Sequence, residues 1–166
     1  MEDVEKIIKI LNKKYKVKPW KEKPFRLLVA TLLSHRTKDE KTHQAFKELF
    51  SKANTPKKIL KLSEKEIEKL IRKVGFYRQK AKRIKKISKI ILEKYKGNVP
   101  SSREELMELP GVGPKTADVV LSYSFSMPVI AVDTHVATIS KRLGWAKSKE
   151  PEKIREELHK IIPKKI

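Results

Sequence analysis

The segment LPGVGPKTA, residues 109–117, constrains the fold more than any other part of the chain. Its two glycines supply backbone conformations that a Cβ atom would penalise, and Pro114 suits the first turn of a following helix. The segment therefore predicts a tight turn between two helices. Free amide groups in such a turn, together with the positive end of the next helix, favour an anion. We expect a phosphate to bind near residues 111–116.

Helical spacing of apolar residues continues along the rest of the chain, and no segment alternates cleanly enough to predict a strand. The fold class is therefore expected to be all-α. The predicted helices cover about Val4–Tyr15, Phe25–Ser34, a third helix ending near Phe50, a short one from Thr55-Pro56, Ser63 to Gly75, Arg78–Tyr95, a short one after Ser102, Pro114–Tyr123, Asp133 to Leu143, and Pro151 to Pro163, with Lys18-Pro19-Trp20 separating the first two.

Short polar residues mark several helix starts. Thr37 or Asp39 is a candidate cap for the third helix, and capping boxes begin at Ser63 and Ser102. Gly75 is expected to close the helix that Ser63 opens. Basic residues crowd the expected exposed face of helix 78–95 and are candidates for phosphate contacts: Lys80, Lys82, Arg83, Lys85, Lys86 and Lys89.

The formal net charge of +21, from 41 Lys and Arg against 20 Asp and Glu, indicates a polyanionic partner, and nucleic acid is the first candidate. A solvated lysine coat of the kind found in hyperthermophilic proteins is the alternative, and scarce Gln and Asn favour a thermophilic prokaryotic source. The lack of cysteine excludes a disulfide scaffold, a cysteine-ligated zinc site and an iron–sulfur cluster within the chain. We expect no cofactor and no metal site.

No long apolar run and no signal-peptide pattern is present in the sequence. We therefore expect a soluble, cytoplasmic, nucleoid-associated protein without membrane contact, and a monomer.

Three motifs carry a family resemblance. LPGVGPKTADVV (109–120), IAVDTH (130–135) and GFYRQKA (75–81) resemble the endonuclease III branch of the helix–hairpin–helix DNA glycosylases, the HhH-GPD superfamily, with matching order and spacing over roughly residues 4–163. The resemblance implies two helical lobes with a DNA cleft between them. One lobe of six helices would span 20–125 and include the hairpin at about 102–123, and the other would combine 1–19 with 126–166.

The chemistry of base excision suits two residues near the turn. Breaking an N-glycosidic bond passes through an oxocarbenium-like sugar, which calls for a nearby negative charge and a nucleophile. Asp133 can supply the charge and Lys115 the nucleophile. The resemblance implies the same roles, in a bifunctional glycosylase and abasic-site lyase of base excision repair that acts on oxidised pyrimidines in double-stranded DNA.

Lys115 must lose its proton before it attacks. Its place in the first turn of a helix favours that loss, whereas a nearby Asp133 opposes it, so the sequence gives no net direction. One hypothesis is that Asp133 takes the proton from Lys115. Asp133 is equally well placed to cap the helix that follows it, and the two roles are compatible.

The resemblance also implies contacts with DNA. Phe76 stands where the family has an intercalating leucine, and Arg36 where it has a glutamine that fills the vacated base stack. Phe76 as a core residue, and His135 as a structural histidine rather than a phosphate contact, stay open as alternatives. The expected DNA-binding residues are Leu109, Gly111, Val112, Gly113, Pro114, Thr116, Arg36, Phe76 and His135.

Two departures from the family keep other functions open. Many relatives continue past the segment ending at Pro163 into a further helix and a four-cysteine iron–sulfur cluster, whereas this chain stops at Ile166, as a naturally short form or a truncation. The alternatives are a monofunctional mismatch glycosylase, which Lys115 disfavours, and a non-catalytic helix–hairpin–helix DNA-binding module.

Overall fold

The structure is a computed structural model that describes residues 2–16 and 21–164. Within these residues the regular structure is entirely helical, which confirms the all-α fold class. The expected break at Lys18-Pro19-Trp20 lies outside the described residues. The helices are α1 (Glu2–Tyr15), α2 (Pro24–Ser34), α3 (Asp39–Lys52), α4 (Pro56–Lys61), α5 (Glu64–Leu70), α6 (Tyr77–Tyr95), α7 (Arg103–Met107), α8 (Pro114–Phe125), α9 (Thr134–Arg142) and α10 (Pro151–Ile161).

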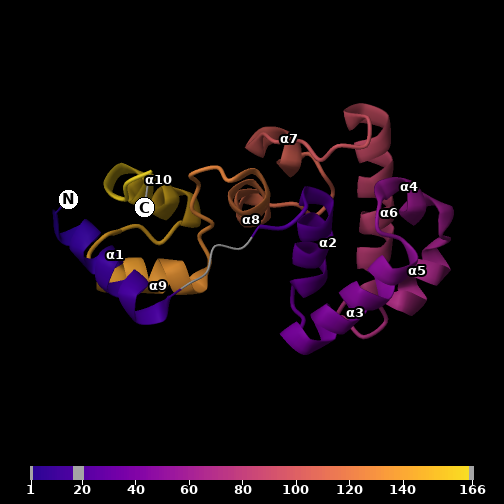
Figure 1. Cartoon of the computed structure of the whole chain (residues 1–166), viewed down its shortest axis with the longest axis horizontal. Helices are drawn as coiled ribbons and strands as arrows, with labels where there is room; N and C mark the ends of the chain where they lie inside the picture. The colour runs from indigo at the N-terminus through magenta and orange to yellow at the C-terminus, as the bar shows by residue number, and fades with distance from the viewer. Residues whose placement is uncertain (1, 17–20, 165–166) are drawn as a thin grey trace.

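The helices are arranged in two groups along the long axis of the molecule. Helices α1, α9 and α10 lie at one end, together with both chain termini, and α2 to α7 lie toward the other end (Figure 1). Helix α8 runs between the two groups. Its N-terminal turn is therefore placed where residues from both ends of the molecule meet.

Buried apolar side chains form two separate clusters that follow this arrangement. The larger contains residues from α2 to α8, among them Leu28, Ile84 and Leu121. The smaller consists of Val132, Ala146, Ile154 and Leu158. Residue 20, at the expected boundary between lobes, lies outside the described residues, so that boundary stays a prediction.

An ionic network joins helices that belong to the two clusters. Asp118 of α8 is 1% exposed and accepts two hydrogen bonds from Arg103 of α7, at 3.0 and 3.3 Å. Arg103 also donates to Glu152 of α10 at 2.8 Å. Nε of Arg155 lies 3.1 Å from Asp118, within ion-pair distance but without hydrogen-bond geometry. Removing one partner of such a buried group leaves an uncompensated charge, so the network fixes α10 against α8.

The capping box predicted at Ser63 is confirmed, because Ser63 and Glu66 form it completely. A short helix does start at Thr55-Pro56, and the Thr55 hydroxyl caps it by accepting a hydrogen bond from the Lys58 amide. At Ser102 the hydroxyl accepts from the Glu105 amide and donates to the Glu105 carboxylate, so only the serine half of the expected box is formed.

Three local predictions are wrong. The N-cap of α3 is Lys38, without a side-chain hydrogen bond, because the Thr37 hydroxyl bonds elsewhere and Asp39 is already the first residue of α3. Helix α5 ends at Leu70, well before Gly75. Lys80 is not on the exposed face of α6, because its side chain is buried and 4% exposed.

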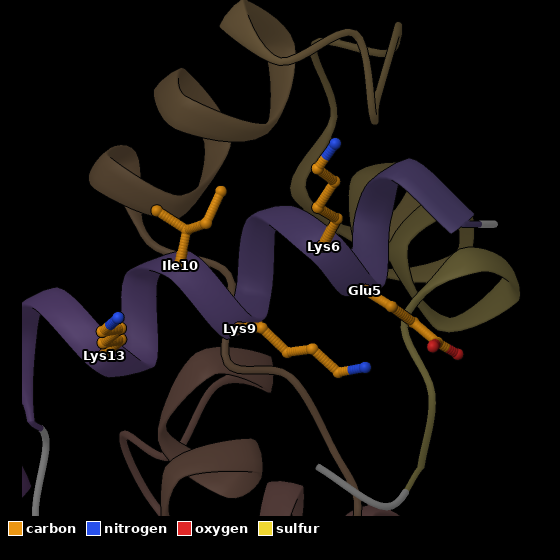
Figure 2. A pocket seen from close by; sticks show the side chains of 5 residues that line it. All are labelled: Glu5, Lys6, Lys9, Ile10 and Lys13. Carbon is orange, nitrogen blue, oxygen red and sulfur yellow. The ribbon is translucent and has the colours of Figure 1, made fainter.

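An open groove of about 550 Å³ runs along α1 and is far from the turn at 109–113. Lys6 and Ile10 point to one side of the helix, whereas Glu5 and Lys9 point to another, so these side chains do not converge (Figure 2). The groove therefore has no arrangement of groups that would act together.

Among the described helices none is long and apolar enough to cross a membrane.

Candidate DNA-backbone and nucleophile site

The hairpin between α7 and α8 is held by apolar side chains and leaves its backbone free. Leu109 and Val112 are 1% and 6% exposed, and the Val112 amide donates to the Leu109 carbonyl at 3.0 Å. Their side chains are therefore part of the core, and the DNA contacts expected at these positions stay a prediction. Any contact at these two positions has to come from the backbone.

The glycine positions supply the unpaired donors. Gly111 is exposed with φ +80°, a region that glycine enters without penalty. Among the described residues, the amides of Gly111 and Gly113 donate to no protein acceptor. Pro114 is the first residue of α8, so the amides of the next two residues have no acceptor within the helix. The geometry is that of an anion-binding turn.

Arg83 of α6 lies directly against this turn. A Cβ atom built on Gly111 would come within 2.9 Å of Cδ and 3.1 Å of Nε of Arg83. Arg83 has no ion pair with a described residue. The guanidinium therefore adds a positive charge next to the free amides of the turn.

Lys115 is exposed in the first turn of α8, and it forms no ion pair with Asp133 among the described residues. It lines a cavity of about 290 Å³ together with Val132, the residue before Asp133, and with residues of α10. The structure therefore brings the segment that carries Asp133 to the same cavity as Lys115. Asp118, Glu152 and Arg155 of the ionic network also line this cavity.

Asp133 is the N-cap of α9. Its Oδ1 accepts a hydrogen bond from the Val136 amide at 2.8 Å, and the residue is half-buried. The cap role considered from sequence is therefore confirmed. Because the hydrogen bond uses only Oδ1, Oδ2 has no partner among the described residues. The cap fixes the orientation of the carboxylate and leaves one oxygen available.

His35 links the loop after α2 to the start of α8. Its Nε2 lies 3.2 Å from the hydroxyl of Thr116, a side chain that is 3% exposed. Burial, followed by the charges of Lys80, Lys115 and Arg83, lowers the pKa of His35 below its usual value. The imidazole is consequently neutral at pH 7 and lies within electrostatic reach of Lys115.

Arg36 and Phe76 are brought together although they are 40 positions apart in the chain. The Arg36 guanidinium lies 5.6 Å from the centre of the Phe76 ring. Phe76 is 59% exposed, so the alternative that it packs in the core is wrong. Both residues have left-handed backbones, with φ of 53° and 56°. His135, in contrast, is exposed, and no bond to a described residue defines its role.

Sequence reasoning missed three elements of the site: buried Lys80, the His35–Thr116 contact and the Asp118 network. A signal for Lys80 was present, because it lies four and seven positions before Ile84 and Ile87 on the apolar stripe of α6. Lys80 was nevertheless expected on the exposed face of the helix, because a lysine is charged. The contacts of His35 and Asp118 join distant segments and have no local signal.

No group of three or more His, Asp or Glu among the described residues is arranged to hold a metal ion. The four-cysteine cluster found in family relatives does not fit this chain, which has no cysteine.

Two endonuclease III proteins are similar to this chain in sequence. The chain is 51% identical over 143 residues to endonuclease III of Thermotoga maritima, covering 86% of this chain and 67% of that protein. It is 42% identical over 140 residues to endonuclease III of Escherichia coli K12, covering 84% and 66%. The chain thus spans about two thirds of the length of these relatives.

A solved structure of a trapped endonuclease III–DNA covalent intermediate has the same fold. It superimposes with a TM-score of 0.88 at 40% identity and covers 98% of this chain and 78% of that one. The family of HhH-GPD superfamily base excision DNA repair proteins matches residues 29–164. With hairpin, helix order and fold in agreement, the chain belongs to the HhH-GPD superfamily of base excision DNA repair proteins.

Proposed function

We propose that this chain is a DNA glycosylase and abasic-site lyase that removes oxidised pyrimidines from double-stranded DNA and then cleaves the strand. The observation that carries the proposal is the position of Lys115. Its amine is exposed beside free backbone donors, and it lines a cavity shared with the segment that leads to Asp133. The similarity to endonuclease III, including a trapped covalent DNA intermediate, supports the same assignment.

DNA binding begins with the phosphate backbone. The free amides of Gly111 and Gly113 and the N-terminus of α8 bind phosphate oxygens, and Arg83 adds charge beside them. The backbone is thereby held next to Lys115, in the cleft expected between the two lobes. These contacts carry no base specificity, so the proposed preference for oxidised pyrimidines rests on the family resemblance of the sequence motifs alone.

A base inside a duplex cannot reach the Lys115 amine, so the nucleotide has to leave the stack. Phe76 is exposed and apolar, which suits a wedge between base pairs. Arg36 lies beside it and can donate hydrogen bonds to the base left without a partner. The two side chains together fill the space that the extruded nucleotide vacates.

The reaction then needs a neutral amine. An unperturbed lysine is protonated at neutral pH, and we propose that Oδ2 of Asp133 accepts the proton from Lys115 as the nucleotide enters. The lone pair of Nζ attacks C1′, and the electron pair of the N-glycosidic bond leaves with the base, which takes up a proton. That proton comes from Asp133, and the carboxylate restored by this transfer stabilises the positive charge on the sugar.

Strand cleavage follows from the covalent bond to lysine. The C1′–O4′ bond then breaks as O4′ takes up a proton from Nζ, and this opening of the sugar ring leaves a protonated Schiff base between Nζ and C1′. Loss of a C2′ proton then moves an electron pair into the C2′–C3′ bond, while the C3′–O bond breaks and releases the 3′ phosphate. Water finally hydrolyses the Schiff base and frees Lys115.

Borohydride trapping tests the proposal directly. The protein is incubated with a duplex that contains an oxidised pyrimidine, in the presence of a chelator and without added metal, and is then reduced. We expect a covalent adduct with the wild type and none with Lys115→Gln. Lys153→Gln is the matched control, because Lys153 is another exposed lysine in the first turn of a helix that starts with proline.

The other outcomes distinguish the alternatives. Base release without an adduct would indicate a monofunctional glycosylase, and binding without release a DNA-binding module. For the role of Asp133, a pH–rate profile unchanged in Asp133→Asn would exclude it as the proton acceptor.

A further inference from the structure

Lys80 is a buried lysine whose ammonium group is fully hydrogen-bonded. Nζ donates to the Leu33 carbonyl at 2.7 Å, to the His35 carbonyl at 2.6 Å and to the Thr37 hydroxyl at 3.1 Å. A lysine ammonium has three donors, so all of them are used. All three acceptors lie in segment 33–37, which comprises the end of α2 and most of its connection to α3.

This segment contains the C-terminal end of α2, where helix carbonyls have no donor partners within the helix and carry a partial negative charge. Lys80 therefore stabilises the end of α2 from a different helix. Stabilisation of a helix end would be a sufficient explanation, except that Arg36 lies between two of the three acceptors. The contact also fixes the backbone on both sides of this arginine.

The same contact reaches Phe76 through Thr37. The Thr37 hydroxyl accepts a hydrogen bond from the Gly75 amide at 3.0 Å in addition to the one from Lys80. A Cβ atom on Gly75 would lie 2.9 Å from the Arg36 carbonyl oxygen, so the two backbones touch. The Thr37 hydrogen bonds and the backbone contact between Gly75 and Arg36 thus form one junction, and the side chains of Arg36 and Phe76 project from it next to each other.

Backbone strain at Phe76 supports a functional purpose for the junction. The other non-glycine residues with left-handed backbones, Lys16, Arg36, Lys96 and Ser126 among those described, follow the C-terminal ends of helices. Phe76 instead immediately precedes α6. A left-handed backbone at a residue other than glycine is strained and persists only where the surroundings enforce it.

We propose that Lys80 is a positioning residue whose ammonium group locks segment 33–37 against Gly75, so that Arg36 and Phe76 enter the DNA stack as one rigid pair. This inference rests on the proposed function, in which the two side chains open the duplex. Lys80 itself touches no DNA, because its side chain is buried.

The lock also sets the distance between this pair and the nucleophile. His35, whose carbonyl accepts from Lys80, contacts Thr116, the neighbour of Lys115, through its ring. A shift of segment 33–37 would therefore move the wedge and the start of α8 relative to each other. Nucleotide extrusion and attack on the sugar depend on this single junction.

Charges around Lys80 make the lock sensitive to pH. Burial, and then the positive charge of Arg83 on the same helix, lower the pKa of Lys80 to about 8. His35 of the facing segment is neutral, and the described structure gives Lys80 no acidic partner. Above this pH the neutral amine has two donors for three acceptors, so one hydrogen bond of the lock is lost.

The experiment measures duplex opening without chemistry. The duplex carries a non-cleavable tetrahydrofuran abasic site, with 2-aminopurine opposite, and its fluorescence reports unstacking on binding. We expect Lys80→Met and Thr37→Val each to reduce the opening equilibrium at least about tenfold, because Thr37→Val removes one hydrogen bond to the charged ammonium group and Lys80→Met removes all three, while Kd stays within a few-fold of wild type. Lys85→Met is the control, because Lys85 is on the same helix and its ammonium group donates at 2.6 Å to the Leu62 carbonyl, which lies outside segment 33–37 and engages Lys85 within the protein instead of in the phosphate contact considered from sequence.

A double-mutant cycle separates positioning from general stability. In a Phe76→Ala background, Thr37→Val is expected to cause little further loss of opening, because the wedge that it positions is already gone. If Lys80→Met fails to fold, Thr37→Val decides the question, since it removes only a hydroxyl.

The outcomes distinguish this inference from the proposed function. Folded Lys80→Met and Thr37→Val variants that open the duplex like wild type, or an equal loss with and without Phe76, would overturn the positioning role alone. A wild-type protein that binds the duplex without any fluorescence change would overturn the proposed opening of DNA as well.

Discussion

The hairpin turn at 109–113 and the connection at 33–37 are both short links beside helix ends, yet they use their polar groups in opposite ways. In the turn, the amides of Gly111 and Gly113 have no acceptor among the described residues. In the connection, Lys80 bonds to two carbonyls and a hydroxyl. Open donors are suited to bind a ligand, whereas saturated groups hold a shape. The comparison therefore assigns phosphate binding to one link and wedge placement to the other.

The largest loss of stability is expected where Gly75 packs against the backbone of segment 33–37. In Gly75→Ala the new methyl group would lie 2.9 Å from the backbone oxygen of Arg36, which cannot rotate away. Such overpacking costs about 1–3 kcal/mol, and we expect the free energy of unfolding, measured by urea denaturation, to fall by this amount. Duplex opening should fall as well, because the junction has to separate. An unchanged stability would show that the two segments are not rigidly packed.

A smaller loss of stability, accompanied by a loss of DNA binding, is expected in the open turn. Gly111→Ala places a side chain at φ +80°, which costs about 1–2 kcal/mol, although the clashing Arg83 side chain can move aside. We expect weaker binding to an undamaged duplex, measured by fluorescence anisotropy. Gly113→Ala is the control, because its φ is −100° and no atom lies within 4 Å of the new Cβ. Equal effects of the two variants would contradict a turn that depends on left-handed geometry.

The charge of Lys80 gives the saturated connection a pH signature. Since its pKa in the folded protein is about 8 and that of a free lysine is higher, the unfolded chain binds more protons between pH 8 and 10. Stability should therefore rise with pH in this window, by at most about 1.4 kcal/mol per pH unit. The rise is measured as the difference between wild type and Lys80→Met in urea unfolding. A difference that does not change from pH 8 to 10 would show that Lys80 titrates normally.

These two links also show what the sequence reveals and what it hides. The hairpin was predictable because a glycine turn, a proline at the first helical position and a following lysine are local signals. The caps at Thr55 and Ser63 were predictable for the same reason. Thr37 was expected to cap α3 because hydroxyl groups before a helix usually do so. It instead accepts from Gly75 and Lys80, which are 38 and 43 positions away in sequence.

The burial of Lys80 also could not be predicted from the sequence, because lysine carries a charge. A lysine is almost never fully buried unless it is paired, so its place on the apolar stripe of α6 was not enough to predict burial. The acceptors that make burial possible exist only once α2 and α6 are packed. Such tertiary hydrogen bonds, like those of Asp118, cannot be predicted from local patterns.

The smallest effect concerns Arg83, which lies beside the open turn. Each phosphate contact in duplex DNA contributes about 0.9 to the slope of log K against log salt concentration. If the guanidinium binds a phosphate together with the Gly111 amide, Arg83→Gln should reduce this slope by about that amount. The measurement is binding of an undamaged duplex at several salt concentrations, in which chemistry has no part.

Lys82→Gln provides the control for Arg83, since it removes the same charge from an exposed neighbour on α6. The total charge of +21 attracts DNA to the whole surface, and a general attraction would give both variants the same small change in slope. Only a localised phosphate contact makes the change in slope larger for Arg83→Gln than for Lys82→Gln. Equal slopes would therefore assign the role of α6 to long-range attraction and leave phosphate binding at the hairpin to the backbone amides alone.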